Sequence, residues 1–191
     1  MKNKKIWSPI IAGIVFAVIL ILDLTTKEVV ISHLIPNVGD SVEVMPGFIN
    51  FVYIENRGGA WGIFSNSTIG LAIISIIILI LILLFFVLRL RKVKNESSMW
   101  LAVSIGLVAG GCIGNMIDRF ALGFVRDFIN FQFINFPVFN FADVAICVGV
   151  VTLMIYFLFF YSKEEKANKE DKKEGGNEWF LFDWQRKCAT R

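Results

Sequence analysis

Four long apolar segments, at about residues 7–22, 69–88, 99–117 and 138–161, limit what this chain can fold into. Each approaches or exceeds the ~20 residues that an α-helix needs to cross the ~30 Å hydrocarbon layer of a membrane. A soluble domain of 191 residues would contain fewer apolar residues than the 56% found here, and more charged residues than 18%. The sequence therefore predicts an all-α membrane protein with four transmembrane helices.

The distribution of lysine and arginine predicts how these helices are oriented. The first apolar segment follows a lysine-rich start (MKNKK), as in a signal peptide, but it lacks a small-x-small cleavage site, so we interpret it as a retained anchor. Basic residues concentrate there, after the second segment and in the tail from Lys163 onward. Because cytoplasmic loops retain an excess of Lys and Arg, we expect both termini in the cytoplasm. The loops at about 25–67 and 118–137 then lie outside.

The first outer loop and the tail differ in composition. The segment SVEVMPGFINFVYIEN in the loop is rich in Val, Ile, Phe and Tyr, with a turn at Pro46–Gly47, which predicts a small β-element on the membrane surface. NRGGAWGIF, which follows, is interpreted as a turn and a short interfacial helix. Residues 162–191 form a charged cytoplasmic tail that we expect to be disordered. Residues 1–161 then form one membrane-embedded domain.

Polar residues gather at the outer end of the third apolar segment. Glycine recurs every fourth residue from Gly106 to Gly114, a pattern that lets another helix approach closely. Asn115, Asp118 and Arg119 follow on one helix face. An ion pair between Asp118 and Arg119 at the membrane interface would explain Asp118 alone, but three such residues in register favour a polar site.

The fourth apolar segment also begins with polar residues. Asn140 and Asp143 share a helix face; helix capping explains Asn140 but not the deeper Asp143. Ionisable residues within a membrane span are usually functional. Asp127 lies in the short preceding loop and can approach Asp143. Two carboxylates brought together in an apolar setting cannot both ionise, so they share a proton, and one acts as base while the other acts as acid. This is the chemistry of an aspartic protease.

Other catalytic schemes have less support. The only histidine, His33, has no evident partner and is interpreted as a loop residue. The three cysteines lack metal-ligand spacing, so we predict neither a metal site nor a disulfide. Asp23 and Lys27 lie one helical turn apart, and an ion pair or an anchor at the membrane interface is favoured over a direct role in catalysis.

Five motifs, in this order, resemble those of the bacterial lipoprotein signal peptidases (type II signal peptidases), over about residues 7–161. They are DLTTK (23–27), NRGGAWG (56–62), GGCIGNMIDR (110–119), VRDF (125–128) and FNFAD (139–143). The resemblance implies an intramembrane aspartic endopeptidase of the bacterial cell membrane, with its active site at the outer face. Such an enzyme removes signal peptides from diacylglyceryl-modified prolipoproteins by cutting before the lipobox cysteine.

The resemblance also implies roles for individual residues. Asp127 and Asp143 match the catalytic pair. The residues expected to line the site are Asn56, Asn115, Arg119 and Asn140, and those expected to support it are Asp23, Lys27 and Asp118. No cofactor and no nucleic acid is implied. The expected partners are prolipoproteins with a lipidated cysteine and membrane lipid, and we expect a monomer.

Three positions depart from the family pattern: Leu24 replaces a usual Gln, Gly59 replaces a usual Ala, and Arg126 replaces a usual apolar residue before Asp127. We expect the Arg126 side chain to point outward, toward the lipid headgroups.

Two non-enzymatic functions remain as alternatives. A proton-coupled carrier or channel could use Asp118, Asp127 and Asp143 as a proton path, and a membrane scaffold would need no such residues. The sequence shows no repeat symmetry, and its polar residues cluster at one membrane face, which favours the peptidase.

Overall fold

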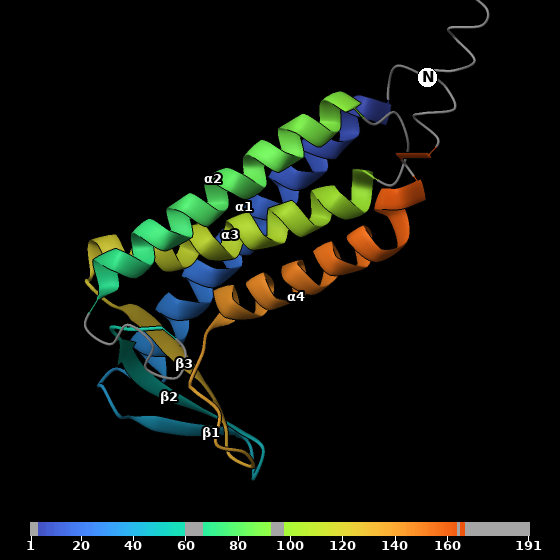
Figure 1. Cartoon of the computed structure of the whole chain (residues 1–191). Coiled ribbons are helices and arrows are strands. Elements are labelled where there is room, and N and C mark those ends of the chain that lie inside the picture. The colour runs from blue at the N-terminus through green and yellow to red at the C-terminus, as the bar shows by residue number, and fades with distance from the viewer. Residues whose placement is uncertain (1–3, 60–66, 93–97, 164, 167–191) are drawn as a thin grey trace, which may run out of the picture.

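The computed structural model describes residues 4–59, 67–92, 98–163 and 165–166. Its helices are α1 (Lys4–His33), α2 (Thr68–Lys92), α3 (Ser98–Ala121) and α4 (Phe141–Tyr156), which continues as a π-helical segment, η2 (Phe157–Tyr161). Its strands are β1 (Ser41–Met45), β2 (Ile49–Asn56) and β3 (Val125–Phe131), which form an antiparallel sheet in that order. The sheet lies at one end of the helix bundle, and the start of α1 and the end of α4 lie at the other (Figure 1).

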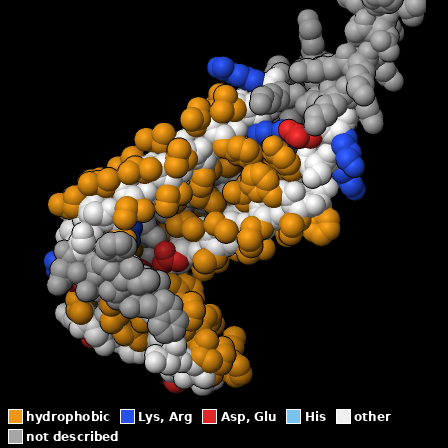
Figure 2. All heavy atoms as spheres, in the orientation of Figure 1, with side chains coloured by type: hydrophobic (Ala, Val, Ile, Leu, Met, Phe, Trp, Pro, Cys, Tyr) orange, Lys and Arg blue, Asp and Glu red, His pale blue; other side chains and the backbone are white. Residues whose placement is uncertain are grey.

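Four helices in the described part of the chain are long and apolar enough to span a membrane. The candidate spans contain 27, 24, 23 and 21 residues: Trp7–His33, Thr68–Arg91, Met99–Ala121 and Phe141–Tyr161. Each exceeds the ~20 residues that a span requires. Figure 2 shows hydrophobic side chains covering the visible face of the bundle, where they would face lipid. The predicted fold, a multi-pass membrane protein with four spanning helices and a small sheet, is confirmed.

The central helix of the bundle is α3. In its most apolar stretch 61% of the residues are buried inside the protein, against 17% in each of the other three helices. Glycine makes this close packing possible. A Cβ added at Gly106 would lie 2.7 Å from the carbonyl oxygen of Ala12, and one added at Gly111 would lie 2.4 Å from the carbonyl oxygen of Ala142. The close helix approach predicted for the glycine stripe is therefore confirmed, and α3 uses glycine toward both α1 and α4.

Replacing Gly114 with alanine is expected to destabilise the protein. An added Cβ at Gly114 would lie 2.3 Å from Oδ2 of Asp23, whereas one at Gly13, on α1, would meet nothing within 4 Å. Overpacking of this kind costs about 1–3 kcal/mol, so the Tm of Gly114→Ala in detergent should fall by several degrees. Gly13→Ala is the matched control and should not lower the Tm. Equal Tm values for both variants and the unaltered protein would contradict this packing.

The β-hairpin predicted around Pro46–Gly47 is confirmed, with β1 and β2 joined by a tight turn in which Gly47 has a φ of 73°. Two other segments differ from the expectation. Helix α1 continues to His33, so His33 ends a helix instead of lying in a loop, and the segment with Asp127 is a third strand instead of a loop.

A small core attaches the sheet to the bundle. It consists of buried residues from the end of α1, the following loop, β2 and β3: Val30, Ile35, Tyr53 and Phe128. Phe128 of this core is next to Asp127 in β3, so the core also fixes the position of Asp127. The interfacial helix expected after NRGG falls largely on residues 60–66, which lie outside the described residues, as does the tail from residue 167.

Candidate functional site

A cavity of about 430 Å³ lies where the sheet meets the bundle. Its polar lining comes from β2, α3, β3 and α4: Asn56, Asn115, Arg119, Asp127 and Asp143. Its apolar lining includes Val125, Phe131, Phe136, Pro137, Val138, Phe139, Val144, Ile146 and Val148. The two candidate carboxylates thus line one mainly apolar cavity.

Asp127 is held by two asparagines. Asn56 Nδ2 donates to Oδ2 at 2.8 Å, and Asn140 Nδ2 donates to Oδ1 at 2.6 Å. The β2–β3 register is irregular between Phe51 and Ile54, next to the position opposite Asp127. Such irregularities redirect side chains near active sites. Asp127 is 1% exposed, so its carboxylate depends on these hydrogen bonds instead of on water.

Asp143 is fixed at the first turn of α4. Asn140 is the N-cap residue and accepts a hydrogen bond from the Asp143 N–H at 3.1 Å, while the Asn140 N–H donates to Asp143 Oδ2, also at 3.1 Å. This reciprocal arrangement is a capping box. The expectation that capping explains only Asn140 was therefore wrong, because the Asp143 carboxylate caps the helix as well. Its other oxygen accepts from Asn115 Nδ2 at 2.8 Å.

The asparagines connect the two carboxylates to each other. Asn140 Nδ2 reaches Asp127 Oδ1 and also lies 2.9 Å from Asn115 Oδ1. Asn115 in turn donates to Asp143. Burial, together with the neighbouring charge of Asp143, raises the pKa of Asp127 to about 7, against the opposing hydrogen bonds from Asn56 and Asn140. A proton on Asp127 is therefore compatible with neutral pH.

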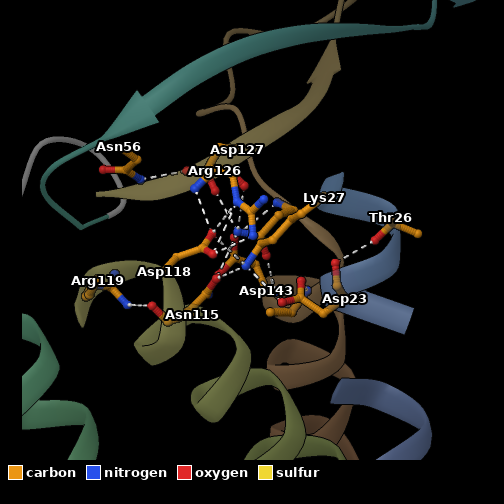
Figure 3. A network of polar contacts seen from close by, with 12 residues as sticks. Asp23, Thr26, Lys27, Asn56, Asn115, Asp118, Arg119, Arg126, Asp127 and Asp143 are labelled. Carbon is orange, nitrogen blue, oxygen red and sulfur yellow. Dashed lines mark hydrogen bonds and ion pairs between the residues drawn. The ribbon is translucent and has the colours of Figure 1, made fainter. Parts of the chain in front are cut away.

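Behind the cavity, Lys27 binds three groups at once (Figure 3). Its Nζ lies 2.8 Å from Asp23 Oδ2, 3.3 Å from Asp118 Oδ2 and 2.9 Å from Asn115 Oδ1. The Lys27 and Asp23 side chains are fully buried, and Asp118 is 1% exposed. Asp23 Oδ1 also accepts from the Ala142 N–H at 2.9 Å, which ties α1 to the start of α4. Of the two interpretations favoured for Asp23 and Lys27, the structure has the ion pair.

The ion pair with Arg119, which the sequence left open as an alternative explanation of Asp118, is not the pairing that the structure has. Asp118 pairs with Arg126, whose Nη2 lies 2.8 Å from its Oδ1, and with Lys27. Consecutive helical residues point about 100° apart, so Asp118 faces α1 and β3, while Arg119 lines the cavity. The outward orientation expected for Arg126 was wrong, because its side chain is only 16% exposed and binds Asp118.

Arg119 retains hydrogen-bonding capacity. Its Nη1 donates to the Asn115 carbonyl oxygen at 3.5 Å, and its buried Nε has no partner among the residues that the structure describes. Sequence reasoning did not identify the apolar cavity wall, although the aromatic pattern FINFPVFNF before Asn140 is a visible signal of it.

Comparisons with known proteins agree with this architecture. The family model described as "Signal peptidase (SPase) II" matches residues 15–159. A lipoprotein signal peptidase of Lactobacillus gasseri is 36% identical over 165 residues, covering 86% of this chain and 100% of the relative. One from Enterococcus faecalis is 32% identical over 159 residues, covering 83% of this chain and 92% of the relative.

A solved structure described as a bacterial membrane enzyme has a TM-score of 0.67 and 34% sequence identity to this chain. The similarity covers 77% of this chain and 87% of the solved one. The family match extends over most of the chain, from within α1 to η2, and includes every residue of the cavity's polar lining. The chain therefore belongs to the signal peptidase II family and is a multi-pass membrane peptidase.

Proposed function

We propose that this protein is an intramembrane aspartic endopeptidase that removes signal peptides from diacylglyceryl-modified prolipoproteins, cutting before the lipid-bearing cysteine. The observation that carries the proposal is the placement of Asp127 and Asp143 on the wall of one cavity, joined through asparagine hydrogen bonds. The names of the relatives, lipoprotein signal peptidases, support the substrate class.

In the proposed reaction the two aspartates divide the proton transfers. Asp127, whose pKa is raised to about 7 by burial and by the charge of Asp143, holds the proton at the start. Ionised Asp143 takes a proton from water as the water oxygen attacks the scissile carbonyl carbon. Asp127 gives its proton to the carbonyl oxygen, which yields a tetrahedral diol. Asp127 then takes back a proton from one hydroxyl of the diol, and Asp143 gives the proton that it took from water to the leaving amine. The C–N bond breaks, and both aspartates return to their starting states.

The remaining polar residues orient the reacting groups. Asn56, Asn115 and Asn140 fix the carboxylates by the hydrogen bonds described above. The Arg119 guanidinium lines the cavity with its Nε unpartnered in the described part of the chain. A buried donor without a partner is costly, and a substrate carbonyl would satisfy it. The apolar wall suits the hydrophobic residues of a signal peptide.

Cleavage is expected to depend on pH through Asp127. With the pKa of this carboxyl raised to about 7 by burial and by the charge of Asp143, the pair holds its proton below neutrality and is about half deprotonated near pH 7. Above that pH both carboxylates ionise and the acid is lost, so kcat/KM should fall as the pH rises through about 7. Steady-state rates measured on both sides of neutrality check this. A kcat/KM that keeps rising well into the alkaline range would contradict it.

The proposal places the cavity at the outer face of the bacterial cell membrane, with both termini in the cytoplasm. The sheet lies at the end of the bundle opposite the start of α1 and the end of α4 (Figure 1), and the basic loops predict a cytoplasmic location for those ends. A cysteine placed at the exposed Ser41 in β1 should react with an impermeant thiol reagent in intact cells. Labelling only after permeabilisation would show that the sheet lies on the cytoplasmic side and that the proposed orientation is wrong.

A further inference from the structure

We propose that Arg126 is a positioning residue for Asp127. Its guanidinium, held by the buried carboxylate of Asp118, fixes the strand that carries one catalytic carboxylate. This inference rests on the proposed function of Asp127. It adds a residue that lies outside the catalytic pair and outside the asparagines that hold the pair.

Residue 126 binds Asp118 through both its backbone and its side chain (Figure 3). The Arg126 N–H donates to Oδ2 at 3.0 Å, and Nη2 donates to Oδ1 at 2.8 Å. Nε lies 3.2 Å from Oδ1 and 3.3 Å from Oδ2. A carboxylate that engages several N–H groups of one arginine restricts orientation as well as distance. Asp118 is 1% exposed and Arg126 is 16% exposed, so water competes little for these bonds.

The strand geometry connects this pair to Asp127. Arg126 and Asp127 are consecutive in β3, so their side chains leave the strand on opposite faces. On one face Arg126 binds α3 through Asp118. On the other, Asn56 and Asn140 donate to Asp127. A rotation of β3 that moved Asp127 out of the cavity would therefore have to break the Arg126–Asp118 pair.

Arg126 also balances the charges behind the cavity. The Lys27 ammonium contacts both Asp23 and Asp118, so one buried cation faces two buried carboxylates. Arg126 supplies a second cation to Asp118. Without the Arg126 guanidinium, Asp118 would attract the Lys27 ammonium more strongly. The hydrogen bond from Lys27 to Asn115 would then weaken. Asn115 holds the second catalytic carboxylate, so loss of the guanidinium would disturb both members of the pair.

The test compares Arg126→Met and Arg126→Lys with Glu28→Gln. The kcat and KM are measured for a purified prolipoprotein that carries a diacylglyceryl cysteine, together with the folded fraction of each variant. Arg126→Met should lower kcat about tenfold, since small misplacements of reacting groups cost up to ~100-fold. It should leave KM nearly unchanged. Arg126→Lys keeps the charge without the planar fork, so it should recover part of the loss.

Glu28→Gln is the matched control because it removes the other partner of the same guanidinium. Arg126 Nη1 lies 3.2 Å from Glu28 Oε2, but Glu28 is 68% exposed. Exposed ion pairs contribute little, so kcat should stay close to that of the unaltered protein.

An unchanged kcat in folded Arg126→Met overturns the inference, and so does a loss confined to KM or to the folded fraction. If Arg126→Met does not fold, Arg126→Lys decides: a reduced kcat with unchanged KM supports the inference, and an unchanged kcat overturns it. Cleavage by folded Asp143→Asn would overturn the proposed function instead, so the two failures are distinguishable.

Discussion

Replacement of Lys27 with methionine is expected to lower the free energy of unfolding by about 3–5 kcal/mol, the usual cost of removing one partner from a buried ion pair. The Lys27 ammonium bridges Asp23 and Asp118, and all three side chains are almost completely buried. Methionine has a similar length but no charge, so Asp23 would lose its only ion-pair partner in the described part of the chain. The Tm of the purified variant in detergent checks this.

Two further variants separate charge from packing at this position. In Lys27→Met/Asp23→Asn the unpaired carboxylate is also removed, so the Tm should recover in part. Arg57→Met removes an ion pair with Glu55 in which Arg57 is 57% exposed, and exposed pairs contribute little, so it should change the Tm only slightly. A Lys27→Met variant as stable as the unaltered protein would show that the buried pairing does not support the fold.

The four spans were predictable because a membrane permits few alternatives to long apolar helices. The end of the first helix was less accessible to sequence reasoning. The apolar run ends at Asp23 and the polar stretch TTKE follows at residues 25–28, which is typical of a loop, yet α1 continues to His33. Asp23 and Lys27 are satisfied by each other and by α3 and α4 instead of by water. This compensation depends on residues distant in sequence, which local composition does not reveal.

The third strand was missed for a related reason. VRDFINF pairs with β2, which lies about 70 positions earlier in the chain, as the Asn56–Asp127 hydrogen bond illustrates. Helix spacing did predict that polar side chains gather at one end of α3 and at the start of α4, because it places Asn115 one turn from Arg119, and Asn140 one turn from Asp143. The ion-pair partners of these polar side chains were not predictable. Asp118, for example, binds Arg126 across the α3–β3 junction instead of its neighbour Arg119.

Asp127→Asn and Asp143→Asn are each expected to reduce prolipoprotein cleavage by about 10³-fold or more, because a lone carboxylate cannot supply both proton transfers. Asparagine preserves the shape of each side chain and one accepting oxygen, so one of the two hydrogen bonds that each carboxylate accepts can be kept. The fold should therefore survive. The double variant should lose little more activity than either single one, since residues that act as a unit are not additive.

Asp118→Asn is the matched control for these variants. Asp118 is as buried as Asp127, but it does not line the cavity and binds Lys27 and Arg126 instead. Its replacement should reduce stability and lower activity through the position of β3, without abolishing cleavage. A complete loss of activity in folded Asp118→Asn, equal to that of Asp143→Asn, would mean that the catalytic group has been assigned to the wrong aspartate.

The most direct test of the central claim is the rate at which purified, folded Asp143→Asn cleaves a diacylglyceryl prolipoprotein, with the products identified by mass spectrometry. The unaltered protein should release a signal peptide that ends immediately before the lipid-bearing cysteine. Asp143→Asn should release none above the background of a reaction without enzyme. Cleavage by Asp143→Asn at the rate of the unaltered protein would contradict the claim that Asp127 and Asp143 form the catalytic pair.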